Sequence, residues 1–342
     1  MVVTRFAPSP TGKFHMGSLR TAIFNFLYSK KHSGKFILRI EDTDQERSEK
    51  KFEDEILKIF ELFKLDYDEL NHQSTNNKNH QKYLNYLLEK DFAYKEKDGP
   101  YKFRINKDIE SFEYEDLILG KIKIPSINLD DFSIARSDKN PTFLLSNLVD
   151  DFDQGITHVI RGNDHSINTI KQNLLASELG FNKINYAHIP LIHDLNGKKL
   201  SKRDNITNVD DYIKDGYLVE SIFNFIIKLG NNFNDIEYLD VKEAIKNFEL
   251  KKTVLSPAKF DPKKLNFINQ NYLKQLTFEK FQENLNQKNK MILNDFNLNY
   301  VFQDILDRCI KLTDINLELE KLLNFYLTGN IIEVSKEEII LI

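Results

Sequence analysis

The first 34 residues constrain the fold most, because they combine a strand, a sharp turn and a helix. Residues 2–6 are rich in β-favouring side chains, and the prolines and glycine of residues 7–12 prevent the strand from continuing. Apolar side chains then recur at helical spacing over residues 19–27. Ser18 is placed to cap this helix and Gly34 to end it. The segment therefore predicts a β-strand that turns directly into a helix N-terminus.

A helix N-terminus beside a strand end suits an anion such as a phosphate, because its backbone N–H groups are free and its dipole is positive there. His15 and Gly17 lie at this point. Gly17 would let a phosphate approach the backbone, and His15 can donate a hydrogen bond to a phosphoryl oxygen. A His-x-Gly pair is by itself a weak signal, so the assignment depends on its context.

The following elements extend the pattern to strand, helix, strand, helix. Residues 36–40 predict a second strand and residues 45–63 an amphipathic helix. This order favours a parallel, doubly wound sheet of Rossmann type, which binds ligands at the carboxyl ends of its strands. Arg5, Ser9 and Glu41 fall near such ends.

Further elements are predicted along the chain in the same way. We expect a polar loop at 71–79 and helices at 82–90, at 167–179 before Gly180, within 210–230 and from 274 onward. Strands are expected at 101–105, 121–124, 142–149, 156–161 and 186–192. The predicted fold class is α/β, with a Rossmann-type doubly wound parallel sheet, an α+β insertion and an all-helical C-terminal region.

Three segments, in this order, resemble bacterial-type glutamyl-tRNA synthetases, which are class I aminoacyl-tRNA synthetases. The first is RFAPSPTG with HMGS and FILRIEDTD, where HMGS stands at the place of the HIGH motif. The second is PTFLLSNLVDDFDQGITHVIRGNDHSINTIKQ. The third is KKLSKR, which alone would be taken for a solvated basic loop, and whose Lys199, Ser201 and Lys202 match the KMSKS loop.

The resemblance implies ATP-dependent ligation of L-glutamate to the 3′ end of tRNA(Glu) through a glutamyl-adenylate. Such a reaction needs stabilisation of the charge that builds on the departing pyrophosphate, and no covalent enzyme group. The residues expected to take part in catalysis are His15, Gly17, Lys199 and Lys202. Those expected to bind ATP, which carries Mg²⁺ as a substrate, are Thr11, His15, Gly17, Leu200, Ser201 and Lys202.

Selection of glutamate is expected to be electrostatic, because a guanidinium pairs well with a carboxylate and poorly with the amide of glutamine. Arg5 and Arg161 match the family's arginine pair, and Glu41 matches the position that receives the α-ammonium group. The full set expected to bind glutamate is Arg5, Ser9, Glu41, Phe143, Asn147 and Arg161. Phe143 stands where relatives commonly have a tyrosine, so one hydroxyl contact is expected to be missing.

The resemblance also divides the chain. It implies a first half of the catalytic domain, an inserted module that contacts the tRNA acceptor end, a second catalytic half, a lysine-loop and stem-contact module, and part of an anticodon-binding domain. These segments are 1–72, 73–140, 141–197, 198–272 and 273–342. Relatives often hold zinc in the insertion with cysteines, whereas residues 93–100 contain none, so no zinc and no other protein-bound metal is expected.

Composition limits the remaining possibilities. The net charge of −4 means that any nucleic-acid contact must come from local basic patches, such as the lysines of 251–264. The single cysteine, Cys309, excludes an internal disulfide framework. With no apolar run long enough to cross a membrane and a first motif at Thr4, we expect a soluble cytoplasmic monomer without a transit peptide.

Three alternatives stay open at this point. A shortened paralogue of the glutamyl-queuosine tRNA(Asp) synthetase type would activate glutamate without tRNA and attach it to a modified base. A catalytically silent tRNA-binding paralogue, or a nucleotidyltransferase that does not use tRNA, would also carry parts of the pattern. Whether tRNA(Gln) is a second substrate cannot be decided from these residues, because that choice depends on anticodon contacts.

Overall fold

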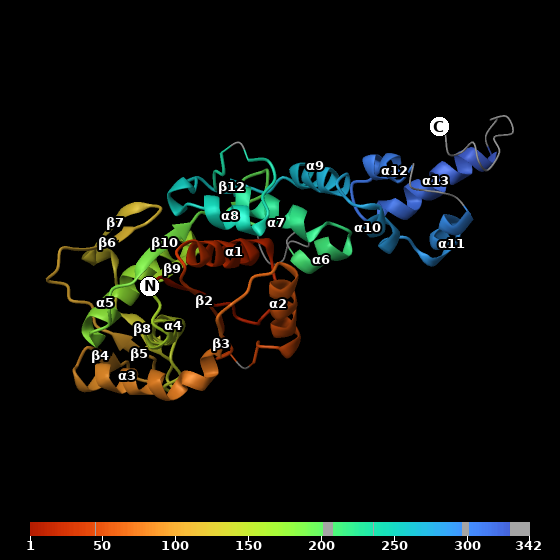
Figure 1. Cartoon of the computed structure of the whole chain (residues 1–342). Helices are drawn as coiled ribbons and strands as arrows, with labels where there is room; N and C mark the ends of the chain where they lie inside the picture. Colours follow the sequence, from red (N-terminus) through yellow and green to blue (C-terminus); the bar gives the residue numbers. More distant parts are fainter. Residues whose placement is uncertain (45, 201–207, 235, 296–300, 329–342) are drawn as a thin grey trace. The chain divides into compact units, whose positions relative to one another are not determined.

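The computed structural model describes residues 1–44, 46–200, 208–234, 236–295 and 301–328 (Figure 1). The chain divides into two compact units, Met1–Thr207 with Ile227–Phe260 and Asn208–Ile226 with Asp261–Ile342.

The first unit is built on a seven-stranded sheet in the order β3-β2-β1-β9-β10-β6-β7 (Figure 1). The pairs from β3 to β6 are parallel, and only the edge strand β7 pairs in the antiparallel direction. The predicted Rossmann-type parallel sheet is therefore confirmed. Its strands are β1 (Val3–Phe6), β2 (Lys35–Ile40), β3 (Glu69–His72), β6 (Ser111–Asp116), β7 (Gly120–Pro125), β9 (His158–Gly162) and β10 (Asn185–Ile189).

Two smaller sheets accompany the main one. An antiparallel sheet contains β4 (Ala93–Lys95), β5 (Tyr101–Phe103) and β8 (Phe132–Ala135). A two-stranded parallel sheet contains β11 (Ile192–His193) and β12 (Ala258–Lys259).

Helices connect and follow the strands. They are α1 (Met16–Lys31), α2 (Lys50–Leu62), α3 (Asn77–Glu89), α4 (Phe143–Asp153), α5 (Ser166–Leu179), α6 (Val209–Lys214), α7 (Val219–Lys228), α8 (Val241–Asn247), α9 (Pro262–Leu273), α10 (Phe278–Glu283), α11 (Gln287–Asp295), α12 (Phe302–Arg308) and α13 (Asp314–Thr328). Short 3₁₀ segments lie at η1 (Gln73–Asn76), η2 (Ser126–Asn128), η3 (Asn163–His165) and η4 (Leu250–Lys252).

The order of the strands reverses between β1 and β9. Helix α1 leads from β1 to β2 on one side of this point, and α5 leads from β9 to β10 on the other. Right-handed crossovers in opposite directions place α1 and α5 on opposite faces of the sheet. Helix α1 packs against α8, while α5 packs against α3 and α4. A reversal of this kind leaves a crevice at the carboxyl ends of β1 and β9, where such folds bind ligands.

The strand predicted at 142–149 is wrong, because these residues form the first part of α4. An apolar run of this length does not by itself separate a buried strand from a buried helix. Leu145, Leu148 and Val149 are all buried at helical spacing. Pro141 and the extended Thr142 precede the first helical turn, and the backbone carbonyl of Thr142 accepts from the N–H of Ser146.

The polar loop predicted at 71–79 is also wrong. This segment contains the end of β3, all of η1 and the start of α3. Its polar side chains bind the carboxylates of α4: Gln73 and Asn76 donate to Asp150 at 2.7 and 2.8 Å. The asparagine-rich composition thus serves a buried hydrogen-bond network.

Strand β6 was not among the predicted strands. Its side chains alternate, with Phe112 and Tyr114 buried and Glu113 and Glu115 exposed. This period-2 pattern is typical of a half-buried strand. Strand β6 joins the main sheet through the pairing of Asp116 with Tyr186 on β10.

The second unit is helical in its described residues, as predicted for the C-terminal region. Its hydrophobic core includes Leu273, Phe281, Leu285, Ile305, Leu306, Cys309, Ile315 and Leu319. Cys309 is buried there as a small apolar side chain.

Candidate functional site

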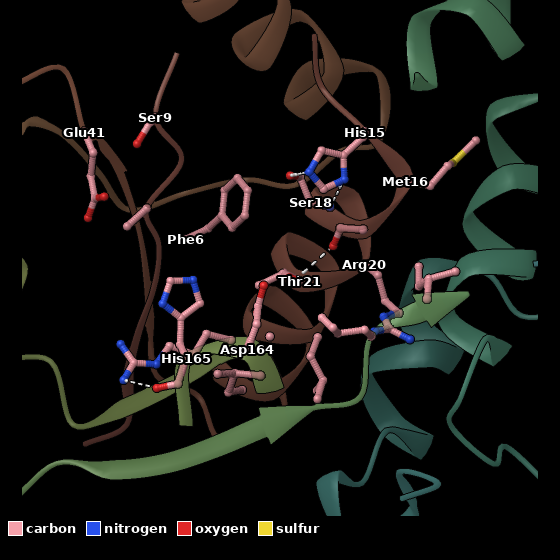
Figure 2. A pocket seen from close by; sticks show the side chains of 18 of the residues that line it. Phe6, Ser9, His15, Met16, Ser18, Arg20, Thr21, Glu41, Asp164 and His165 are labelled. Atoms are coloured by element: carbon pink, nitrogen blue, oxygen red, sulfur yellow. Dashed lines mark hydrogen bonds between the residues drawn. The ribbon is translucent and has the colours of Figure 1, made fainter. Parts of the chain in front are cut away.

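A cavity of about 620 Å³ lies at the carboxyl ends of β1, β9 and β10, where the strand order reverses. Ten of the residues expected to act in the site line it together: Arg5, Ser9, His15, Gly17, Glu41, Phe143, Asn147, Arg161, Lys199 and Leu200. Figure 2 shows Glu41 and Ser9 on one side of the cavity and His15 and Ser18 on another.

Thr11 is not among the lining residues; its backbone N–H donates to the carbonyl of Ser9. Ser201 and Lys202, as well as Asp204, lie outside the residues that the structure describes.

The start of α1 forms one wall of the cavity. His15, and not Ser18 as predicted, is the N-cap: its Nδ1 accepts a hydrogen bond from the backbone N–H of Ser18 at 3.1 Å (Figure 2). Ser18 lies inside the first turn, and its hydroxyl is 3.0 Å from Nε2 of His15. A Cβ atom on Gly17 would stand only 3.0–3.1 Å from the imidazole ring. Gly17 therefore leaves the room that the capping histidine occupies.

Arg161, at the end of β9, contributes a buried guanidinium to the cavity. Its Nη2 donates to the hydroxyl of Thr169 at 2.7 Å and to the backbone carbonyl of His165 at 3.4 Å. Its Nη1 has no hydrogen-bond partner, and among the described residues no carboxylate forms an ion pair with it. Burial lowers the pKa of Arg161 to about 10, so the side chain is still charged at neutral pH.

Arg5, at the end of β1, is held by a carboxylate instead. Its Nε donates to Asp151 of α4 at 3.0 Å. The same carboxylate oxygen of Asp151 is 2.8 Å from Nη1 of Arg39, which is fully buried on β2. Burial opposes ionisation of Asp151, but the two arginines outweigh it and hold its pKa below the ordinary value.

Glu41 lies at the end of β2 beside this network. Its Oε1 accepts from Asn147 Nδ2 at 2.6 Å and is 3.6 Å from Nη2 of Arg39. Gln172 of α5 in turn donates to the side-chain oxygen of Asn147 at 3.2 Å. Burial raises the pKa of Glu41, although Arg39 and Asn147 favour its ionised form. The arrangement fixes one carboxylate oxygen of Glu41 and the orientation of the Asn147 amide.

Phe143 is partly exposed, and its ring centroid is 5.4 Å from that of His165. His165 lines the cavity as well, and burial together with the nearby Arg161 lowers its pKa to about 4 (Figure 2). No periodic pattern in the sequence singles out His165, because it lies in the 3₁₀ turn η3.

Lys199 also lines the cavity. Its ammonium group is 2.9 Å from Oδ2 of Asp164, and both side chains are about half-exposed. Burial opposes ionisation of Asp164, but the hydrogen bond from Lys199 and the charges of His165 and Lys199 together outweigh it and lower the pKa of the carboxyl group. Asp164 was missed in the sequence, although it follows a strand end directly.

Arg20 is another lining residue that the sequence did not reveal. It is buried on α1, and its guanidinium donates to the backbone carbonyls of Leu229 and Pro190. Burial lowers its pKa to about 10. Arg20 thus connects the first helix to the segments that follow β10 and α7. The only sequence signal of this role is an arginine inside an apolar helical stripe.

Within the described ranges, no group of three or more histidine, cysteine, aspartate or glutamate side chains could hold a metal ion. No described helix is both long enough and apolar enough to cross a membrane.

Comparisons with known proteins agree with this geometry. Residues 1–109 and 95–267 match the catalytic domain of the class I tRNA synthetases for glutamate and glutamine (E and Q). A glutamate–tRNA ligase 2 of Neorickettsia sennetsu is 46% identical over 82% of this chain and 68% of its own length. A glutamate–tRNA ligase of Pelagibacter ubique is 38% identical over 83% of this chain and 69% of its own length.

Among solved structures, a glutamate tRNA ligase from Elizabethkingia meningosepticum, in complex with its amino acid, has a TM-score of 0.82 and 27% identity. The match covers 93% of this chain and 79% of that one. A glutamate–tRNA synthetase from Elizabethkingia anophelis gives a TM-score of 0.80 at 27% identity, over 92% of this chain and 79% of that one. The predicted resemblance is confirmed: the chain belongs to the glutamate–tRNA ligases, which are class I aminoacyl-tRNA synthetases.

Proposed function

We propose that this chain joins L-glutamate to the 3′ end of tRNA(Glu) in an ATP-dependent reaction with a glutamyl-adenylate intermediate. The observation that carries the proposal is the buried Arg161, which lines a cavity at the switch point of the sheet and whose Nη1 has no hydrogen-bond partner. A buried cation without an anionic partner is costly unless a ligand supplies one. The side-chain carboxylate of glutamate is such a ligand, and relatives of the chain carry the name glutamate–tRNA ligase.

The glutamate-binding residues take separate roles in this proposal. Arg161 and Arg5 bind the side-chain carboxylate, and Glu41 receives the α-ammonium group. Asn147, which is already oriented by Gln172 and Glu41, and Ser9 supply polar contacts. Phe143 supplies an apolar face only, because it lacks the hydroxyl of the tyrosine common at this place.

The nucleotide-binding residues lie at the start of α1 and at the lysine loop. His15 and Gly17 contact phosphate at the helix N-terminus, where the dipole and N–H groups favour an anion. Lys199, and in the same proposal Thr11, Leu200, Ser201 and Lys202, complete the ATP site. Mg²⁺, bound to the phosphates, would neutralise part of their charge.

The first step forms a bond between a carboxylate oxygen of glutamate and the α-phosphorus, and breaks the bond to the leaving pyrophosphate. His15 and the lysines stabilise charge on the phosphoryl oxygens, and no side chain forms a covalent bond. In the second step a ribose hydroxyl of the tRNA attacks the acyl carbon and AMP leaves. The enzyme contributes position and electrostatics in both steps.

The segments of the chain keep their expected roles. We propose acceptor-end contacts for 73–140, stem contacts for 198–272 and anticodon contacts for 273–342. The lysines of 251–264 would bind the phosphate backbone of tRNA. We propose that the chain acts as a monomer in the cytoplasm, and tRNA(Gln) is the second substrate to test.

The paralogue that modifies a tRNA base is not favoured, since relatives at 36–46% identity are named glutamate–tRNA ligases. One assay separates it from the proposal: glutamate-dependent ATP–pyrophosphate exchange, with and without tRNA(Glu), followed by transfer of labelled glutamate to tRNA. Exchange that needs tRNA, with label at the 3′ end, supports the proposal. Exchange without tRNA supports the paralogue, and no exchange supports a silent binder.

Lys202→Ala should abolish activity.

A further inference from the structure

Arg161 is the first member of a row of side chains that crosses three neighbouring strands. The register of the sheet places His188 on β10 directly beside Arg161 on β9. Asp116, the last residue of β6, pairs with β10 two residues before His188. The three side chains come from segments that are distant in the sequence, and all three are buried.

These side chains form a continuous hydrogen-bond network. Nδ1 of His188 is 2.6 Å from Oδ2 of Asp116, and Nε2 of His188 is 3.3 Å from Nε of Arg161. Thr169 of α5 closes the network, because its hydroxyl is 3.1 Å from Nε2 of His188 and accepts from Nη2 of Arg161. Asp116 is fixed in turn by the backbone N–H groups of residues 118 and 119.

The donors and acceptors allow only one protonation state of His188. Nε–H of Arg161 is always a donor, so Nε2 of His188 must accept and carries no proton. The single ring proton therefore lies on Nδ1, where Asp116 accepts it. This is the neutral Nδ1–H tautomer, in agreement with the pKa of His188, which burial lowers against the opposing effect of Asp116. Asp116 thus selects the tautomer that can accept from Arg161.

Of this network, only Arg161 lines the cavity. The network engages Nε and Nη2 of the guanidinium and leaves Nη1 without a partner. The network therefore fixes the plane of the guanidinium through residues that do not line the cavity. Its partners for Arg161 are neutral, so the positive charge is oriented and not cancelled.

We propose that His188 and Asp116 are positioning residues for glutamate recognition: His188, in the tautomer selected by Asp116, holds Arg161 so that Nη1 faces the side-chain carboxylate. The proposal rests on the proposed function, in which Arg161 binds that carboxylate. Neither His188 nor Asp116 touches the substrate. Their effect should appear in selectivity for glutamate and not in binding of the adenosine part.

Two substitutions of His188 divide the network. In His188→Gln the amide oxygen can reach the position of Nε2 and still accept from Arg161. In His188→Asn the amide can still donate to Asp116 but is too short to reach Arg161. Both variants carry a side-chain amide, and they differ in whether this amide can accept from Arg161. A third variant, Arg161→Gln, removes the contact with the substrate itself.

The probes are the sulfamoyl analogues of glutamyl-adenylate and glutaminyl-adenylate, titrated by calorimetry. His188→Asn should weaken binding of the glutamyl analogue about tenfold, as for loss of a hydrogen bond to a charged group, and leave the glutaminyl analogue within about threefold. His188→Gln should stay within about threefold for both. Equal losses for both analogues, or no loss in His188→Asn, would overturn the proposal.

Two further results separate the failure of this proposal from that of the proposed function. If Arg161→Gln binds the glutamyl analogue as tightly as the unmodified chain, the assignment of Arg161 is wrong, and the positioning role is wrong with it. If Arg161→Gln weakens that binding but His188→Asn does not, only the positioning role is wrong. Imidazole ¹⁵N shifts of His188 in the unmodified chain give a test without variants: an Nε2–H tautomer or a charged ring would contradict the network.

Discussion

The two arginines of the cavity lie on neighbouring parallel strands, yet their surroundings differ. Arg5 on β1 shares Asp151 with Arg39, so a carboxylate compensates its charge within the protein. Arg161 on β9 has only neutral partners in Thr169, His188 and a backbone carbonyl. Burial of the guanidinium charge lowers the pKa of Arg161 to about 10. In the described structure no carboxylate offsets the cost of this burial through a direct contact.

This difference separates stability from recognition. The Arg5 side is a buried ion network that joins β1, β2 and α4, and breaking it should mainly destabilise the fold. The Arg161 side keeps a charge available for a ligand, and breaking it should mainly affect binding. The following substitutions test the two halves of this comparison, in order of decreasing expected effect.

Asp151→Asn should give the largest effect, and on stability. It removes the charge that Arg5 and Arg39 share, and loss of one member of a buried ion network costs about 3–5 kcal/mol. The free energy of unfolding is measured by urea unfolding followed by circular dichroism. Asp153→Asn is the matched control, because Asp153 is an exposed residue of the same helix and its asparagine partners can still donate. Equal stability of Asp151→Asn and the control would contradict the ion network.

Arg161→Gln should affect recognition and not stability. Loss of a buried charged contact with the substrate carboxylate is expected to cost about 3 kcal/mol of transition-state stabilisation. This cost lowers kcat/KM for glutamate on the order of 100-fold. Its urea midpoint should be unchanged or higher, because a desolvated charge is removed. Arg104→Gln, at a surface arginine paired with Asp91, is the control. A strongly lowered midpoint would show that Arg161 is structural.

The stability penalty of Asp151→Asn should depend on pH. The pKa of Asp151 is lowered below 3.8, because the two arginines outweigh the effect of burial. A lowered carboxyl pKa contributes stability that is complete above the unfolded-state value and is lost as the pH falls through the folded-state value. The difference in unfolding free energy between the unmodified chain and Asp151→Asn should thus be constant from pH 7 to about pH 5 and shrink below about pH 4. A difference that grows on acidification would contradict the assignment.

Gly17→Ala should give the smallest effect, on a wall that contains neither arginine. The added Cβ would stand 3.0 Å from Nδ1 of His15 and disturb the cap of α1. We expect phosphate binding at the disturbed N-terminus to weaken by about 1 kcal/mol, so KM for ATP should rise about fivefold. KM for glutamate should stay within about twofold of the unmodified chain, since both arginines are unchanged. An equal rise in both KM values would mean that the walls of the cavity are not independent.

The sequence predicted well what depends on local pattern and on strand ends. The alternation of strands and helices placed Arg5, Glu41 and Arg161 at one edge of a parallel sheet, where the structure brings them into one cavity. Prediction from the sequence failed where contacts between distant segments determine the structure. The apolar run after Thr142 fits a strand as well as a helix, and only the packing of α4 against α3 and α5 distinguishes them.

The electrostatic partners of the site were not predictable from spacing. Arg39 gives no sign in the sequence that it is fully buried, and Asp116, Asp151 and His188 come from three separate segments. Nothing in the sequence points to a role for His188, and its contact with Arg161 becomes visible only when the register of β9 and β10 is known. Residue types thus indicated the ligand, while the topology determines how its partners are held.

The most direct test of the comparison is the preference for glutamate over glutamine in ATP–pyrophosphate exchange in the presence of tRNA(Glu). The unmodified chain should prefer glutamate by about 10⁴-fold, the discrimination reached when the wrong ligand leaves a buried polar group unpaired. Arg161→Gln should reduce this ratio by about 100-fold, mainly through loss of the glutamate reaction. A ratio that is unchanged in Arg161→Gln would show that the uncompensated charge on β9 does not select the substrate.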